Sequence, residues 1–130
     1  MIVLASIPQE LPENVRSDIK RYQDITEKLR LVLLNKQQVQ IQLTEVNNAL
    51  EELNKTEENV TVFKIVGNLM INKKKNEILN ELNEKKDTLE IRLKSLEKQE
   101  KLLKDQLKDL ESKIYKKLGG GVGKTTDVAG

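Results

Sequence analysis

The sequence predicts a mostly α-helical fold, in which a long antiparallel coiled-coil helical hairpin carries a short β-hairpin at its bend. Two long series of apolar residues with heptad spacing predict the two helices. Their matched lengths predict that the helices pair with each other. A β-prone stretch with a Gly-Asn pair at its centre predicts the β-hairpin between them.

The first helix is predicted over residues 13–55. Apolar residues recur there at alternating spacings of three and four, which is the pattern of a coiled-coil seam. Pro8 and Pro12 confine the helix to the residues that follow them, because proline breaks a helix interior. Residues 1–12 are therefore predicted to form a mobile N-terminal segment. The seam series comprises Tyr22, Ile25, Leu29, Val32, Lys36, Val39, Leu43, Val46, Leu50 and Leu53, and Val15 fits the same register.

The second helix is predicted over residues 76–118, with the same rhythm of apolar residues. Helices of equal length joined by a compact linker most simply pair antiparallel along their whole extent. Charged flanks leave each helix with one apolar stripe and a solvated remainder. The second series comprises Leu79, Leu82, Lys86, Leu89, Leu93, Leu96, Glu100, Leu103, Leu107, Leu110, Ile114 and Lys117.

Two charged residues, Lys36 and Glu100, stand at seam positions of the two predicted helices. Antiparallel pairing places them at nearly the same level of the coiled coil. They either pair across the seam and fix its register or extend their long side chains to water. The sequence leaves both readings open.

A β-hairpin linker is predicted over residues 56–75. Residues 60–66 and 69–72 are rich in β-branched and large apolar side chains, and Gly67-Asn68 between them suits a two-residue primed turn. This turn pairs Val66 with Leu69 and Ile65 with Met70, so both faces of the hairpin carry apolar residues. A lone two-stranded hairpin is marginal in water, and its edges offer unpaired backbone groups.

We therefore expect the hairpin to complete itself by joining hairpins of other subunits. The alternative is that it folds onto its own helix ends. The candidate oligomerisation residues are Val60, Val62, Phe63, Ile65, Val66, Leu69, Met70 and Ile71.

Antiparallel pairing also brings the start of the first helix beside the end of the second, where apolar residues gather. Ile19, Tyr115 and Leu118 are expected to lie off the seam, so the seam alone does not explain them. Exposed apolar clusters rimmed by charge usually mark protein-binding sites. The alternative is that these residues close a frayed coil end. We call the set the tip cluster: Ile7, Leu11, Val15, Ile19, Ile114, Tyr115 and Leu118.

The Gly-rich end, residues 119–130, contains Gly123-Lys124-Thr125 and is superficially like a phosphate-binding loop. Such a loop needs a glycine where Leu118 stands, together with a preceding strand and a following helix. A helix is predicted to precede this segment instead. A flexible tail is therefore expected, because Gly-rich sequence does not recover its ordering entropy. An ATPase that uses Lys124 is a weak alternative.

Composition excludes several classes of function. The chain has no cysteine and no histidine, so it lacks thiolate ligands, the usual general base and the commonest metal ligand. We expect no catalytic residues, no metal and no cofactor. The formal net charge is +2 with 34% charged residues, which argues against nucleic-acid binding. No stretch approaches the roughly 20 apolar residues that span a bilayer, so a cytoplasmic protein without membrane contact is expected.

The helix–hairpin–helix arrangement resembles prefoldin, and specifically its beta-type subunit. The resemblance covers about residues 6–118 and is most specific at residues 60–71. It continues through Glu84-Lys85-Lys86 and Leu96-Glu97-Lys98-Gln99-Glu100 in the second helix, and includes the N-terminal Ile7-Pro8-Gln9-Glu10. A single hairpin favours the beta type, because alpha-type subunits carry two. The Gly-rich end departs from the family pattern.

The resemblance implies an ATP-independent holdase, which is a chaperone and not an enzyme. In archaeal members, two alpha-type and four beta-type subunits join their hairpins into an intersubunit β-barrel. The coiled-coil tips capture non-native polypeptides and deliver them to a group II chaperonin. By position, the hairpin residues would build the barrel and the tip cluster would hold clients. The alternative function is a structural coiled-coil adaptor that binds one specific folded partner.

Overall fold

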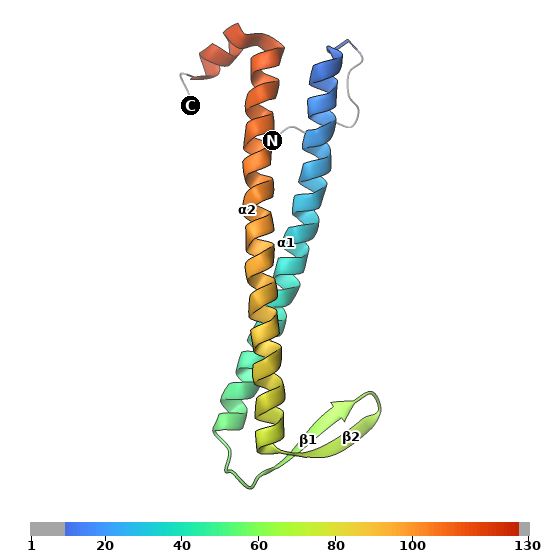
Figure 1. Ribbon diagram of the computed structural model, residues 1–130, viewed down its shortest axis with the longest axis vertical. Helices are drawn as coiled ribbons and strands as arrows, with labels where there is room; N and C mark the ends of the chain where they lie inside the picture. Colours follow the sequence, from blue (N-terminus) through green and yellow to red (C-terminus); the bar gives the residue numbers. More distant parts are fainter. Residues whose placement is uncertain (1–9, 128–130) are drawn as a thin grey trace. The chain divides into compact units, whose positions relative to one another are not determined.

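The computed structural model describes the backbone of residues 10–127 and the side chains of residues 10–119. Its elements follow in the order α1 (Glu13–Asn54), β1 (Thr61–Val66), β2 (Leu69–Lys74) and α2 (Lys75–Asp127), shown in Figure 1. Two long antiparallel helices are thus joined by a short β-hairpin, which confirms the predicted fold class. The mobile segment predicted over residues 1–12 lies largely outside the described residues.

The chain forms two compact units. The terminal unit contains the described residues up to Leu33 and from Lys98 onward, and the hairpin unit runs from Leu34 to Glu97. Each unit draws on both helices, and the β-hairpin belongs to the hairpin unit.

The first helix begins directly after Pro12. The Pro12 carbonyl accepts hydrogen bonds from the amides of Val15 and Arg16, each at 3.0 Å, and so starts the helical hydrogen-bond pattern. Glu13 places negative charge in the first turn, where it interacts favourably with the positive end of the helix dipole. Proline is therefore found ahead of the helix and not inside it, as its missing amide requires.

The core of the terminal unit is an apolar cluster contributed by α1 and α2. Each helix presents one stripe to it, as the heptad spacing predicts. Most polar and charged residues beside these stripes are exposed, and buried Asp18 is the exception. The buried members are Val15, Ile19, Tyr22, Ile25, Leu110 and Ile114, with Leu11, Leu103 and Leu107 packed against them.

Ile19 stands off the predicted seam series, but its expected place on an accessible surface is wrong, because it is only 3% exposed and belongs to this core. Val15, Ile19 and Tyr22 are spaced by four and three residues, so their side chains share one face of α1. The core is consequently wider there than a simple two-position seam.

In the hairpin unit, the buried apolar side chains occupy the predicted seam positions. Leu43 and Leu93, also in the two series, are partly buried. The seam pattern therefore identifies the inward-facing residues in both units. The buried set here is Val39, Val46 and Leu50 on α1, with Leu89 and Leu96 on α2.

The β-hairpin has the predicted register. Strands β1 and β2 pair antiparallel with Val66 opposite Leu69 and Ile65 opposite Met70, which leaves Gly67-Asn68 as the turn. Gly67 adopts a φ of +58°, a conformation that L side chains rarely enter. A positive φ at the first central residue alone suits a type II′ turn, whose twist matches that of the flanking strands.

The second helix differs from expectation at its C-terminal end. The sequence predicts that it ends at residue 118 and that a flexible tail follows, but α2 continues to Asp127. Gly119 interrupts it with a non-helical backbone, so two helical segments meet there. No proline follows Gly119, and the chain therefore retains the amides needed to resume a helix.

Candidate functional surfaces

The β-hairpin exposes most of the residues predicted for oligomerisation. Ile65, Met70 and Phe63 are 71%, 67% and 56% exposed. Val60 and Val62, at the base of the hairpin, are partly buried. The two strands form a sheet of their own, with no third strand among the described residues. Most of the apolar side chains of the hairpin are therefore left exposed in the isolated chain.

The two faces of the hairpin are not equivalent. Alternation along the strands puts every second residue on the same face, and the register assigns partners across the ladder. We define the helix-side face as the one that carries Lys64, and the open face as the one that carries Phe63. The helix-side face contains Val62, Lys64, Val66, Leu69, Ile71 and Lys73, and the open face contains Thr61, Phe63, Ile65, Met70, Asn72 and Lys74.

Ion pairs link the helix-side face to the first turns of α2. Lys64 Nζ donates to Glu81 Oε2 at 2.9 Å, and Lys73 Nζ lies 3.8 Å from Glu77 Oε2. The hydrogen bond from Lys64 holds the pKa of the Glu81 carboxyl below its usual value, and the positive charges of Lys64 and Lys73 act in the same direction. These pairs were not predicted from the sequence, because they depend on the angle at which the hairpin meets the helix.

The tip cluster separates into buried and exposed members. Val15, Ile19 and Ile114 are at most 3% exposed and form core, whereas Tyr115 and Leu118 are 55% and 51% exposed on α2. Leu11 is partly buried and packs against the core cluster. Ile7 lies outside the described residues. The structure therefore brings the described members to one end of the terminal unit but leaves few of them accessible.

Two polar contacts join the helices at the edge of this core. Lys117 Nζ donates to Asp18 Oδ2 at 2.7 Å, and the Tyr22 hydroxyl donates to Glu111 Oε1, also at 2.7 Å. The bond to Glu111, together with burial and the negative charge of that carboxylate, raises the pKa of Tyr22 to about 12.

The heptad series carried a usable signal for the first of these contacts. Asp18 stands seven residues before Ile25 and Lys117 three residues after Ile114, so opposite charges occupy seam positions at facing ends of the series. The pairing of Lys36 with Glu100 stays a prediction. Within α2, Lys104 Nζ lies 2.7 Å from Glu100 Oε2.

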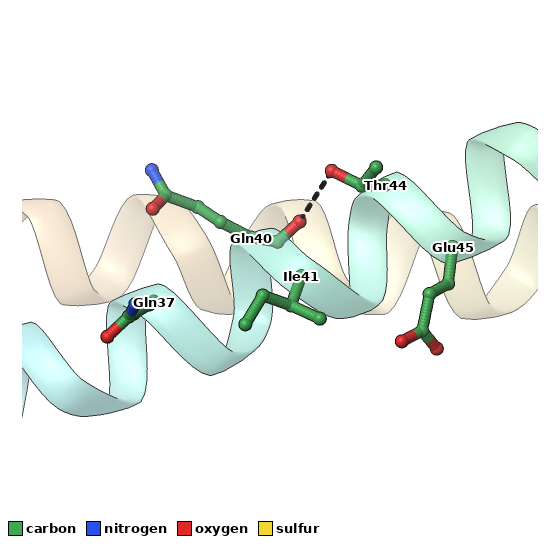
Figure 2. A pocket seen from close by; sticks show the side chains of 5 residues that line it. All are labelled: Gln37, Gln40, Ile41, Thr44 and Glu45. Carbon is green, nitrogen blue, oxygen red and sulfur yellow. Dashed lines mark hydrogen bonds between the residues drawn. The ribbon is translucent and has the colours of Figure 1, made fainter.

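A shallow hollow of about 290 Å³ lies on α1 in the hairpin unit (Figure 2). One helix supplies every lining residue, and the Thr44 hydroxyl donates to the Gln40 carbonyl at 3.0 Å beside it. Small-molecule sites usually enclose most of their ligand and converge several polar groups on it. This hollow does neither, so we assign it no ligand. Its lining residues are Gln37, Gln40, Ile41, Thr44 and Glu45.

Neither a metal site nor a membrane span is found in the part of the chain that the structure describes. No group of three or more Asp and Glu residues is arranged there to hold a metal ion. None of the helices searched combines the length and hydropathy needed to cross a bilayer. The side chains around Lys124, on which the nucleotide-binding alternative depends, lie outside the described residues.

Together these features define a class of protein: a coiled-coil subunit with an exposed apolar β-hairpin between two antiparallel helices. Comparison with known families makes the assignment specific, since residues 16–121 match the family model described as "Prefoldin subunit". The chain belongs to the prefoldin family, as a beta-type subunit, and so to a family of non-enzymatic chaperones.

Relatives of this chain support the beta-type assignment. The prefoldin subunit beta of Caldivirga maquilingensis is 39% identical over 114 residues, which cover 88% of this chain and 94% of the relative. That of Thermococcus onnurineus is 43% identical over 106 residues, covering 82% and 91%. The crystal structure of the prefoldin beta subunit from Thermococcus strain KS-1 matches with a TM-score of 0.76 and 38% identity. That match covers 82% of this chain and 94% of the other.

Proposed function

We propose that this chain is a subunit of an ATP-independent holdase that captures non-native polypeptides and delivers them to a group II chaperonin. It assembles with alpha-type subunits, two of which join four chains of the beta type, and the hairpins form an intersubunit β-barrel. A cytoplasmic location is part of the same proposal. The observation that carries it is the exposed apolar hairpin, together with membership of the prefoldin family.

The hairpin supports the assembly part of this proposal on physical grounds. Phe63, Ile65 and Met70 expose large apolar area to water, and burial against another chain recovers about 25 cal/mol per Å². The two strands also present unpaired backbone edges. Strands of neighbouring hairpins satisfy both requirements at once, because they supply backbone partners and apolar side chains together.

Only the accessible members of the tip cluster are placed to contact a client. Val15, Ile19 and Ile114 stabilise the end of the helical pair and do not meet a client from where they lie. Tyr115 and Leu118 stand three residues apart on α2, so they share one face of the helix. Tyrosine offers a large apolar ring with a polar end, which suits contacts with varied sequences. We therefore assign client contact mainly to Tyr115 and Leu118, with Leu11 beside the core.

Weak contacts of this size become effective when several tips act on one client. A non-native polypeptide exposes many apolar segments, and tethered sites engage them with a high effective concentration. Binding by two side chains per subunit is thus compatible with a useful affinity for the whole complex. It also explains loose selectivity, because any exposed apolar segment serves.

The test is aggregation of a chemically denatured protein on dilution, in the presence of the assembled complex and without nucleotide. We expect the wild-type complex to suppress aggregation at near-stoichiometric amounts. A variant with Tyr115→Ser and Leu118→Ser should lose most of this suppression. The matched control is Leu102→Ser, because Leu102 is also an exposed leucine of α2 in the terminal unit.

The outcomes separate the parts of the proposal. Equal suppression by the double variant and by wild type would remove the client assignment from Tyr115 and Leu118. No suppression by a correctly assembled wild-type complex would remove the holdase function and favour an adaptor that binds one folded partner. Sedimentation of each variant before the assay shows whether the complex has formed.

A further inference from the structure

The hairpin is attached to its own α2 by ion pairs that involve both strands. Lys64 on β1 bonds to Glu81 at 2.9 Å, and Lys73 on β2 lies 3.8 Å from Glu77. The two glutamates stand four residues apart, which places them one above the other on the same side of the helix. Two separate points of attachment fix a direction, whereas one would act as a pivot.

Exposure along the strands agrees with this attachment. On the helix-side face, Val62, Lys64 and Lys73 are partly buried, whereas Phe63 and Ile65 on the open face are exposed. Near its base the hairpin therefore leans on α2 with the helix-side face, whereas Val66, Leu69 and Ile71 nearer the turn are exposed on that face as well. Its opposite face is left for contacts with another chain.

A third lysine restrains the approach to the hairpin. Lys75 Nζ, at the start of α2, donates to the Thr56 carbonyl at 2.8 Å in the connection between α1 and β1. The Thr56 hydroxyl in turn donates to the Leu53 carbonyl at 2.6 Å, close to the end of α1. The connection into β1 is thus tied to the start of α2, next to the point where β2 ends.

We propose that Lys64 and Lys73 are positioning residues for assembly. Through Glu81 and Glu77 they hold the hairpin at one angle to α2, so that Phe63, Ile65 and Met70 are presented to the hairpin of a neighbouring subunit. The inference rests on the proposed function, since it names what prepares the hairpin for its assembly role. The lysines themselves are not the contact surface.

Such positioning matters because ordering a hairpin of low stability costs conformational entropy. A two-stranded hairpin is barely stable by itself, and a hairpin free to swing must be ordered when the complex forms. Holding it beforehand lowers that ordering entropy and strengthens association without any new contact between chains. Exposed ion pairs are individually weak. Their effect is repeated in every copy of the chain within a complex.

The experiment is a charge exchange in the full-length chain, with assembly measured by sedimentation velocity after mixing with an alpha-type subunit. Lys64→Glu and Glu81→Lys each replace an attraction by a repulsion. We expect each to weaken assembly about fivefold, the scale of a weak ion pair together with a new like-charge contact. The double variant, with both exchanges, should restore assembly close to wild type. The matched control is Lys94→Glu, an exposed lysine of α2 in the same unit.

A second readout keeps the positioning role apart from the assembly role. Hydrogen exchange of the amides in residues 61–74 should quicken in Lys64→Glu and return to the wild-type rate in the double variant. If wild type assembles but the single variants match it, or if the exchange of charges restores nothing, the positioning role is overturned. If wild type itself does not assemble, the proposed function fails. Unchanged hydrogen exchange in Lys64→Glu then overturns the positioning role as well.

Discussion

Lys117 Nζ lies 2.7 Å from Asp18 Oδ2, so a salt bridge joins α2 to α1 at the edge of the core of the terminal unit. Asp18 is 8% exposed and is the one buried charged residue of the part that the structure describes. A buried carboxylate is expensive to desolvate unless a partner compensates it. The pair therefore stabilises one alignment of the two helices over alignments that are shifted along the helix axis, because a shift would separate Asp18 from Lys117.

The first prediction concerns removal of that partner. Lys117→Met keeps most of the apolar stem but leaves the Asp18 carboxylate buried without its cation. We expect the free energy of unfolding to fall by about 1–3 kcal/mol, the usual effect of stranding a buried polar group. Urea unfolding followed by circular dichroism measures this change.

The control for this prediction is Lys116→Met, one residue along α2 at an exposed position. It should change the free energy of unfolding by no more than about 0.5 kcal/mol. If the two variants are equally stable, the pair does not hold the helices. Replacement of both Asp18 and Lys117 by leucine should be nearly neutral, because apolar residues often substitute well for a buried ion pair.

The second prediction concerns alkaline pH and Tyr22. Its hydroxyl donates to Glu111, and its pKa in the folded protein is raised to about 12. Because the unfolded chain has a lower tyrosine pKa of about 10, this group stabilises the fold fully below about pH 10. That contribution is lost as the pH rises toward 12.

Between these pH values, the free energy of unfolding of the wild-type protein should decline. The decline should be smaller in Tyr22→Phe. The chain has two tyrosines, so in a Tyr115→Phe background the ultraviolet absorbance of phenolate reports Tyr22 alone. Ionisation of Tyr22 near the pH expected for a free tyrosine would contradict the bond to Glu111.

The third prediction concerns the turn of the hairpin. Gly67 has a φ of +58°, and no atom lies within 4 Å of the position that a Cβ would take. Gly67→Ala therefore introduces backbone strain without a clash, and we expect it to destabilise the hairpin by about 1–2 kcal/mol. Faster hydrogen exchange in β1 and β2 is the measurement.

Asn68→Ala is the matched comparison, because glycine alone has a positive φ among the described residues and Asn68 therefore keeps an ordinary backbone conformation. It should perturb exchange less than Gly67→Ala. The reverse order would mean that the positive φ is not what the turn requires.

The fourth prediction compares two neighbours on α2. Ile114 is 2% exposed and Tyr115 is more than half exposed, although they are adjacent in sequence. Ile114→Ala removes core volume and should lower the free energy of unfolding by about 2–5 kcal/mol. Tyr115→Ala should change stability little. Thermal unfolding of both variants decides between them, and equal losses would contradict the assignment of Tyr115 to the surface.

The burial of Val39 and Leu89 and the turn at Gly67 could be predicted from the sequence because local rules govern them. Heptad spacing selects the side chains that face a partner helix, so it identified the buried residues of both series. Glycine before asparagine, between two β-prone runs, allows few turn geometries. These rules act over a few residues and need no knowledge of the distant chain.

The same rules misjudged Ile19. They placed Ile114 in the seam series and Tyr115 off it, but the tip cluster grouped these residues without using that difference. All three are apolar, and the sequence grouped them as one candidate surface. Their exposure depends on how far α1 and α2 cover each other in the terminal unit. A sequence pattern indicates which way a side chain points, but not how much of it the neighbouring helix covers.

By itself, the sequence determined two long amphipathic helices, their antiparallel pairing and the register of the hairpin, since periodicity and turn chemistry are local properties of the chain. Only the tertiary structure decided which apolar residues stay accessible and which charges meet. The bonds from Lys117 to Asp18 and from Lys64 to Glu81 join residues 99 and 17 positions apart in the chain. Such contacts follow from the distance and angle between packed elements. The heptad register indicates that Asp18 and Lys117 lie at facing seam positions, but no local pattern fixes whether their side chains meet.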